Sequence, residues 1–206
     1  MERSRLPKLG RGFFERYTPA VARDLLGCRL VRVDRGRRLS GIIVETEAYR
    51  GPGDPASHAY PGRTKRNMVM FGEAGHAYLY FIYGFHYCLN VTTEGHGRPG
   101  AVLLRAIEPV EGVVAMARNR HLKGDSHLAD GPGRLTQALR IDQRLNGEDM
   151  VTSRVLFIEK GTGPKRVSRS SRVGITMAKE RKWRYFAAGS SFVSQGKPSA
   201  SRPQNP

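Results

Sequence analysis

Short apolar runs in the first quarter of the chain predict two strands. The runs CRLVRV (28–33) and RLSGIIVETEAY (38–49) mix apolar, β-branched and polar residues, a composition typical of strands. Asp34-Arg35-Gly36 separates the two runs and favours a tight turn. We therefore expect a β-hairpin over residues 28–49.

Helices are predicted by apolar spacing and by cap signals. Thr18-Pro19 precedes AVARDLLG. A threonine can accept the free N–H groups of a first helical turn, and proline suits the first helical position. Gly27 would end this helix. Two further helices are expected over residues 109–122 and 132–141.

An aromatic stretch, YLYFIYGFHYCLN (78–90), holds six of the seventeen Phe, Tyr and Trp residues of the chain. Its interruption at Gly84 predicts two short strands that meet near Tyr83-Gly84. Two more strands are expected over VLLRAI (102–107) and RVLFIE (154–159).

The order of these elements favours an α+β fold, because strands gather early in the chain and helices late. With 206 residues, of which 39% are hydrophobic, the chain is long enough for one sizeable core. We expect one mixed domain over residues 1–194, with an ordered Gly- and Pro-rich loop over 50–76. Residues 195–206 contain no large apolar side chain, which predicts a disordered basic tail.

Positive charge is concentrated at the two ends of the chain. The net charge is +17; residues 1–40 carry 11 Lys and Arg against 4 Asp and Glu, and residues 159–206 carry 11 against 2. The segment between them is nearly balanced, at 13 against 12. A polyanionic partner, nucleic acid first, would explain this distribution. A soluble basic surface or a ribosome-associated module would explain it equally well.

Several classes of protein are disfavoured by what the sequence lacks. There is no run of eighteen apolar residues and no apolar segment behind the basic N-terminus, so we expect neither a membrane protein nor a secreted one. We expect it in the cytoplasm of a prokaryote or the nucleus of a eukaryote. Cys28 and Cys88 match no zinc spacing and predict reduced thiols. No Walker, GxGxxG, HExxH or zinc-deaminase signature is present, which favours chemistry without a metal.

The best candidate for a reactive carboxylate lies in GIIVETEAY. Strict alternation would place Ile43, Glu45 and Glu47 on one face of the strand. A glutamate at the end of an apolar strand can act as a general base on water. The alternative is a pair of exposed carboxylates on an edge strand, where charge is common.

The aromatic stretch and its surroundings also have two interpretations. Alternating aromatics suit a sheet core, but they also suit stacking on nucleic-acid bases. Tyr83, at a predicted hairpin tip, is poorly placed for a core and well placed to enter a DNA stack. Asn90 is either a turn residue or an amide that reads a base edge. Arg105, a lone charge in an apolar strand, is expected to meet a carboxylate or a phosphate.

Taken in order, six blocks resemble the alkyladenine (3-methyladenine) DNA glycosylases. They are VETEAYRGPGDPASH, TKRNMVMF, YLYFIYGFHYCLN, VLLRAIEPVEG, GPGRLTQAL and RVGI, and the match covers roughly residues 15–194. The resemblance implies one mixed α+β domain around a curved antiparallel β-sheet, with flanking helices and a protruding β-hairpin. It also implies hydrolysis of the N-glycosidic bond of alkylated or deaminated purines, without metal or cofactor, by a monomer that binds double-stranded DNA.

The resemblance assigns roles to individual residues. Glu47 matches the catalytic carboxylate that activates water. Arg105 matches a residue that helps to hold this water and a neighbouring phosphate, and the backbone carbonyl of Val173 matches the third ligand of the water. Glu45 matches no catalytic role and is expected to be structural.

The remaining assignments concern the damaged base and the DNA. Tyr49, His58 and Tyr80 match the walls that sandwich a flipped purine, while Asn90 matches a gate against the 2-amino group of guanine. Tyr83 matches the wedge that fills the vacated stack, beside Gly84 in a tight turn. DNA contacts are also expected from Arg63 and Arg66.

Two other functions remain open from the residues alone. A non-catalytic nucleic-acid-binding module could use the aromatic stretch as a stacking platform, and Glu47 would then have no special role. A carbohydrate hydrolase could use Glu45 and Glu47, which on one strand would stand roughly 7 Å apart, a separation that suits an inverting pair. The second alternative leaves the positive charge unexplained.

Overall fold

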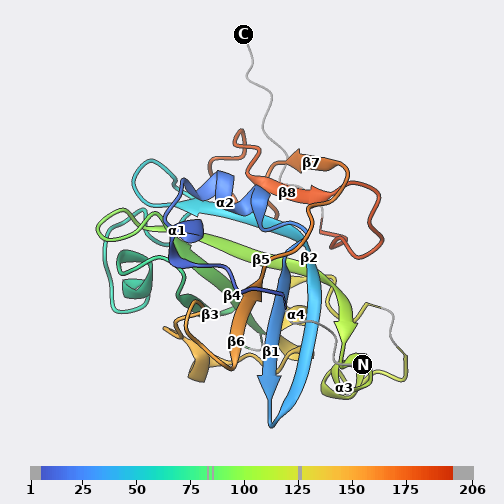
Figure 1. Ribbon diagram of the computed structural model, residues 1–206. Coiled ribbons are helices and arrows are strands. Elements are labelled where there is room, and N and C mark those ends of the chain that lie inside the picture. The colour runs from blue at the N-terminus through green and yellow to red at the C-terminus, as the bar shows by residue number, and fades with distance from the viewer. Residues whose placement is uncertain (1–5, 83, 85, 125–126, 197–206) are drawn as a thin grey trace.

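One antiparallel sheet forms the framework of the molecule, and its longest strand, β2 (Arg37–Arg50), lies in the middle (Figure 1). A computed structural model describes residues 6–82, 84, 86–124 and 127–196. Along the sheet the order is β3 (Ala77–Ile82), β4 (His86–Thr93), β5 (Gly100–Glu111), β2, β1 (Arg29–Asp34) and β6 (Leu156–Glu159). β8 (Arg184–Ala187) pairs with β2 beyond the end of β1, and β7 (Val167–Ser170) pairs with β8. The sheet curls into an open half-barrel.

Short helices accompany the curled sheet. They are α1 (Arg11–Phe14), α2 (Thr18–Asp24), α3 (Val113–Asn119), α4 (Pro132–Ala138) and the 3₁₀ turns η1 (Met68–Phe71) and η2 (Gln143–Leu145). The main hydrophobic core combines side chains from α2, α4 and the sheet, among them Val21, Leu30, Ile43, Leu104 and Leu135. This arrangement confirms the predicted α+β fold around a curved antiparallel sheet. Among the described residues, none of the helices has the length and apolar character to cross a bilayer.

The predicted ends of strands and helices agree best with the structure where the sequence contains a turn signal. The expected hairpin is β1–β2, and Gly36, in its turn, has a φ of +75°. The predicted strand 102–107 is longer, because residues 109–111 continue β5 where a helix was expected. Gly112, at a φ of +74°, then turns the chain into α3. The strands β7 and β8 and the helix α1 were not predicted.

The start of α2 differs from the expected cap. Thr18 makes no side-chain capping bond and is itself the first helical residue. Its backbone N–H donates instead to the Glu94 carboxylate at 3.1 Å, and its hydroxyl donates to the same oxygen at 2.6 Å. A carboxylate from the end of β4 therefore satisfies the helix N-terminus, where negative charge is favourable.

Three register shifts interrupt the pairing of β2 with β5, and two of them lie on either side of Glu45. Ile43 pairs with Ile107, but Glu45 pairs with Ala106, so Val44 is an extra residue in β2. Arg105 is likewise extra in β5, because Thr46 pairs with Leu104. A bulge changes the direction in which a strand presents its side chains.

Because of the bulges, the prediction from strict alternation that Ile43, Glu45 and Glu47 share one face of β2 is wrong. Ile43 and Ala48 both pack in the main core, and the Thr46 hydroxyl donates to the carbonyl of Ala22 in α2. Glu45 and Glu47 therefore lie on the other face of β2 from Ile43, with which they were expected to share a face. The alternative of exposed edge-strand carboxylates is also wrong, since both glutamates are fully buried in a central strand.

The aromatic stretch forms the hairpin β3–β4, as expected. Gly84, in the turn, has a φ of +75° with open space where a Cβ would stand, a conformation that favours glycine. Tyr83, the expected wedge, lies outside the described residues, as do 197–206 of the expected tail. The predicted division of the chain at residue 194 stays a prediction.

Candidate active site

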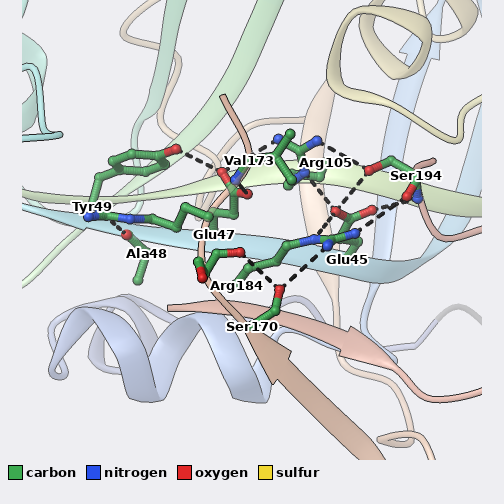
Figure 2. A network of polar contacts seen from close by, with 11 residues as sticks. Glu45, Glu47, Ala48, Tyr49, Arg105, Ser170, Val173, Arg184 and Ser194 are labelled. Atoms are coloured by element: carbon green, nitrogen blue, oxygen red, sulfur yellow. Dashed lines mark hydrogen bonds and ion pairs between the residues drawn. The ribbon is translucent and has the colours of Figure 1, made fainter. Parts of the chain in front are cut away.

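Glu47 is fully buried and held from three sides (Figure 2). The hydroxyl of Tyr49 donates to Oε2 at 2.7 Å, and the backbone N–H of Val173 donates to Oε1 at 2.8 Å. The Nη1 of Arg105 lies 3.5 Å from Oε2. Three contacts leave acceptor capacity on the carboxylate, which has about four lone-pair positions.

The three residues that hold Glu47 all line one cavity of about 330 Å³. Its wall is aromatic on one side, where Tyr49, His58, Tyr78 and Tyr80 gather, and Asn90 also lines it. Glu47 does not itself line the cavity but contacts it through Tyr49, Val173 and Arg105. A volume of this size and an apolar lining with a few polar groups are usual for a small-molecule site.

The tyrosines of this wall are held in the phenol form. Burial first and Glu47 second raise the pKa of Tyr49, so its hydroxyl keeps the proton that it donates to Glu47. Burial and then Cys88 raise the pKa of Tyr80. Burial also raises the pKa of Tyr78 to about 12.

His58 is an exposed residue of the cavity lining whose ring packs edge-on against Tyr80, with ring centres 4.5 Å apart. Its Nδ1 lies 2.9 Å from the Tyr78 hydroxyl. Desolvation, and then the positive charge of Arg66, lower the pKa of His58. The lowered pKa favours the neutral imidazole at pH 7.

Asn90 is almost completely buried, with 3% of its surface exposed. Its Nδ2 donates to the backbone carbonyl of Tyr78 at 3.1 Å, across the β3–β4 ladder. The amide lines the cavity, so it is not a simple turn residue.

Arg63 and Arg66 are exposed on the loop before η1. Asn67 gives that loop a fixed shape. Its Oδ1 accepts from the N–H of Thr64 at 2.7 Å, and its Nδ2 donates to the carbonyls of His58 and Gly62. The Arg66 guanidinium lies 6.0 Å from the centre of the Tyr80 ring. This basic loop therefore stands beside the aromatic wall.

Arg172, which sequence reasoning missed, forms a buried ion pair with Asp54. Both side chains are fully buried, and the two charge-assisted hydrogen bonds measure 2.7 Å each. The guanidinium also lies 4.6 Å from the ring centre of Tyr49. It thereby fixes both Tyr49 and the segment that carries Val173. The only sequence signal was its place beside Val173 in RVGI.

Glu45 accepts hydrogen bonds on both oxygens. Arg105 Nε and Arg184 Nε each donate to Oε1 at 2.7 Å, and the backbone N–H of Ser194 donates to Oε2 at 2.7 Å. Burial alone would lower the pKa of Arg105, but the negative charges of Glu47 and Glu45 raise it. Arg105 therefore meets two carboxylates, as its place in an apolar strand suggested.

Residues that could hold a metal do not gather in the part of the chain that the structure describes: no three His, Cys, Asp or Glu side chains come together there. Cys28 and Cys88 are buried free thiols, and Cys88 lines the cavity. The arrangement is therefore one of buried carboxylates, guanidinium groups and aromatic rings.

Comparison of the sequence with known proteins identifies one family. The family model described as methylpurine-DNA glycosylase (MPG) matches residues 12–191. The chain belongs to this family. Its members are DNA glycosylases, enzymes that hydrolyse N-glycosyl bonds, and DNA is their substrate.

Individual methylpurine-DNA glycosylase relatives are similar over nearly their full length. A protein of Carboxydothermus hydrogenoformans is 47% identical over 189 residues, which cover 91% of this chain and 98% of that protein. A protein of Methanocella arvoryzae is 46% identical over 197 residues, which cover 94% and 98%. Both carry the name "Putative 3-methyladenine DNA glycosylase".

Proposed function

We propose that the protein is a DNA repair N-glycosylase that flips alkylated or deaminated purines out of duplex DNA and hydrolyses their N-glycosidic bond. The damaged bases would include 3-methyladenine, 7-methylguanine, hypoxanthine and ethenoadenine. The observation that carries the proposal is Glu47, a buried carboxylate held by three residues that line an aromatic cavity.

Glu47 would act as the general base. A water molecule attacks C1′ of the sugar and gives a proton to Glu47, while the C1′–N bond breaks and its electron pair leaves with the purine. The negative carboxylate also stabilises the positive charge that develops on the sugar, as in inverting glycoside hydrolases. Arg105 and the carbonyl of Val173 would hold the water. The reaction would use no metal or cofactor.

The aromatic wall would receive the flipped base. Tyr49, His58 and Tyr80 offer ring faces and edges for stacking, and an alkylated purine that carries positive charge is attracted to electron-rich rings. The bulk of Asn90 would exclude the 2-amino group of guanine. Since no lysine of the described residues lines the cavity as an amine nucleophile, the product would be an intact abasic site.

DNA would bind across the basic loop and the hairpin tip. Arg63 and Arg66 are exposed and would meet phosphates, while the turn at Gly84 would carry Tyr83 into the stack. Extrusion of a base costs a few kcal/mol, which the wedge would offset. The active species is proposed to be a monomer that acts on double-stranded DNA containing damaged purines.

The alternative of a carbohydrate hydrolase is disfavoured by Glu45. A second catalytic carboxylate would need a free oxygen, whereas both oxygens of Glu45 accept hydrogen bonds from Arg105, Arg184 and Ser194. The binding-module alternative differs from the proposal in turnover, which an assay measures directly.

The test uses duplexes that contain a single hypoxanthine or ethenoadenine, in the presence of a chelator. The wild-type protein is expected to produce abasic sites, and Glu47→Gln is expected to slow single-turnover excision by about 10²- to 10⁴-fold, as for the loss of a general base. Glu108→Gln makes the same change at an exposed carboxylate and should excise normally. Binding without excision by the wild-type protein would establish the binding module instead.

A further inference from the structure

Glu45 lies at the centre of a second buried network on the far side of Arg105 from Glu47 (Figure 2). The carboxylate is fully buried. Arg105, Arg184 and the Ser194 hydroxyl donate to Oε1, at 2.7, 2.7 and 2.9 Å, and the Ser194 N–H donates to Oε2 at 2.7 Å. Hydrogen bonds to an ionised group are stronger than neutral ones.

The charges of the two networks balance only when they are taken together. Glu45 and Glu47 are both fully buried, while the side chains of Arg105 and Arg184 are 7% and 5% exposed. Two buried carboxylates two residues apart would repel each other if they shared one cation. Because Arg184 gives Glu45 a cation of its own, Arg105 can pair with Glu45 through Nε and still face Glu47 through Nη1.

Ser194 connects both guanidinium groups to the end of the described chain. Its hydroxyl also contacts Nη2 of Arg105 at 3.2 Å, and its carbonyl accepts from Nη2 of Arg184 at 3.4 Å. Three different groups of one residue therefore hold Arg105, Arg184 and Glu45 together.

The chain after Ser194 runs directly against the cavity lining. A Cβ placed on Gly196 would stand 2.8 Å from Cγ1 of Val173 and 3.2 Å from Nη2 of Arg105. A contact of 2.8 Å is closer than real Cβ atoms come. The segment Ser194–Gly196, the C-terminal strap, thus covers the two residues that are proposed to hold the attacking water.

We propose that Glu45, Arg184 and Ser194 are positioning residues that set the Arg105 guanidinium in place for excision, and that the C-terminal strap is part of the active site. This inference rests on the proposed function. None of the three residues lines the cavity, and each contacts Arg105 or its partner Glu45. Their loss should therefore lower the rate of the chemical step and leave DNA binding largely unchanged.

The sharpest variant is Ser194→Ala, because it removes the hydroxyl and keeps the N–H donated to Glu45. Loss of a hydrogen bond of this kind corresponds to a decrease of about 3- to 10-fold in single-turnover excision of hypoxanthine. The dissociation constant for the same duplex should change less than twofold. Ser191→Ala makes the same change at an exposed residue three positions before Ser194 and should match the wild-type rate.

Gly196→Ala provides a second variant, which removes none of the groups that donate hydrogen bonds to Glu45. The added methyl group must displace Val173 or Arg105, so excision should fall by at least as much as in Ser194→Ala. Unchanged excision in both variants would overturn the proposal. An equal loss of rate and of binding would overturn it as well, because that result indicates general damage.

A readout independent of turnover separates this inference from the proposed function. The Nε–H of Arg105 should exchange slowly with solvent in nuclear magnetic resonance spectra, and Ser194→Ala should speed its exchange without affecting Arg172. Should the wild-type protein fail to excise any lesion, the proposed function would be lost while exchange still tested the strap. Equal Arg105 exchange in wild type and Ser194→Ala would show that the strap does not position it.

Discussion

The buried pair of Arg172 and Asp54 predicts a large loss of stability from a single atom change. Asp54→Asn keeps the size of the side chain and an oxygen that can accept from the N–H of Arg50, which donates to Asp54 at 3.0 Å. It removes the negative charge that faces Arg172, whose side chain is fully buried. An uncompensated buried charge costs about 3–5 kcal/mol.

The expected shift in melting temperature follows from the size of the chain. For 150–250 residues, each kcal/mol corresponds to about 2–4 °C, so Asp54→Asn should lower the Tm by about 6–20 °C. The assay is thermal unfolding followed by circular dichroism at pH 7. Glu180→Gln is the matched control, because Glu180 is 71% exposed and lies 3.6 Å from Arg181; exposed pairs contribute little.

A double variant distinguishes charge burial from lost packing. Asp54→Asn combined with Arg172→Met removes both charges and should recover at least half of the lost Tm, because two neutral groups no longer pay for desolvation. A Tm for Asp54→Asn that matches the Glu180→Gln control would refute the reasoning. So would a double variant that is less stable than Asp54→Asn.

Three further predictions concern the pocket and the DNA surface. Asn90→Ser should increase the excision of undamaged guanine relative to hypoxanthine, because a bulky competitor-excluding group is lost; an unchanged ratio would assign the amide to support of Tyr78. His58 has a lowered pKa, so its contribution to stability is present above its ordinary value of 6.5 and is lost as the pH falls through the folded-state pKa; melting curves from pH 7.5 to 4.5 should show a steeper decline for wild type than for His58→Gln. Arg63→Ala and Arg66→Ala should each reduce the slope of log affinity against log salt by about 0.9, and equal slopes would remove these residues from the phosphate contacts.

The parts of the fold that were predictable are those with local signals. Two apolar runs separated by Asp34-Arg35-Gly36 predict β1 and β2, because the turn chemistry stands in the sequence itself. Gly84 marks the β3–β4 turn for the same reason. β7 and β8 carry no such signal, since VSRS and RYFA are only four residues long. They form by pairing with each other and with β2.

Most of the residues of the candidate site could be identified from the sequence, but only some of the contacts between them could be predicted. Glu47 and Arg105 were identified from their places in apolar strands, and Tyr49 from the family resemblance; the structure brings all three together. Arg184 and Ser194 were missed because they are distant from Glu45 along the chain and have no motif. Their role arises from tertiary packing, which the secondary-structure propensities of the sequence do not predict.

The paired bulges at Val44 and Arg105 determine what could be transplanted to another protein. On a regular strand whose residue at position 43 faces inward, ETEAY would point Glu45 and Glu47 inward as well, as two carboxylates among hydrocarbon groups. In such a graft the two carboxylates would turn out to solvent, take up protons or unfold the host protein, because an unpaired buried charge is costly. The smallest unit that could be transplanted is thus β2 together with β5, including the extra residues Val44 and Arg105. Transplanting ETEAY alone would not reproduce the orientation of Glu45 and Glu47.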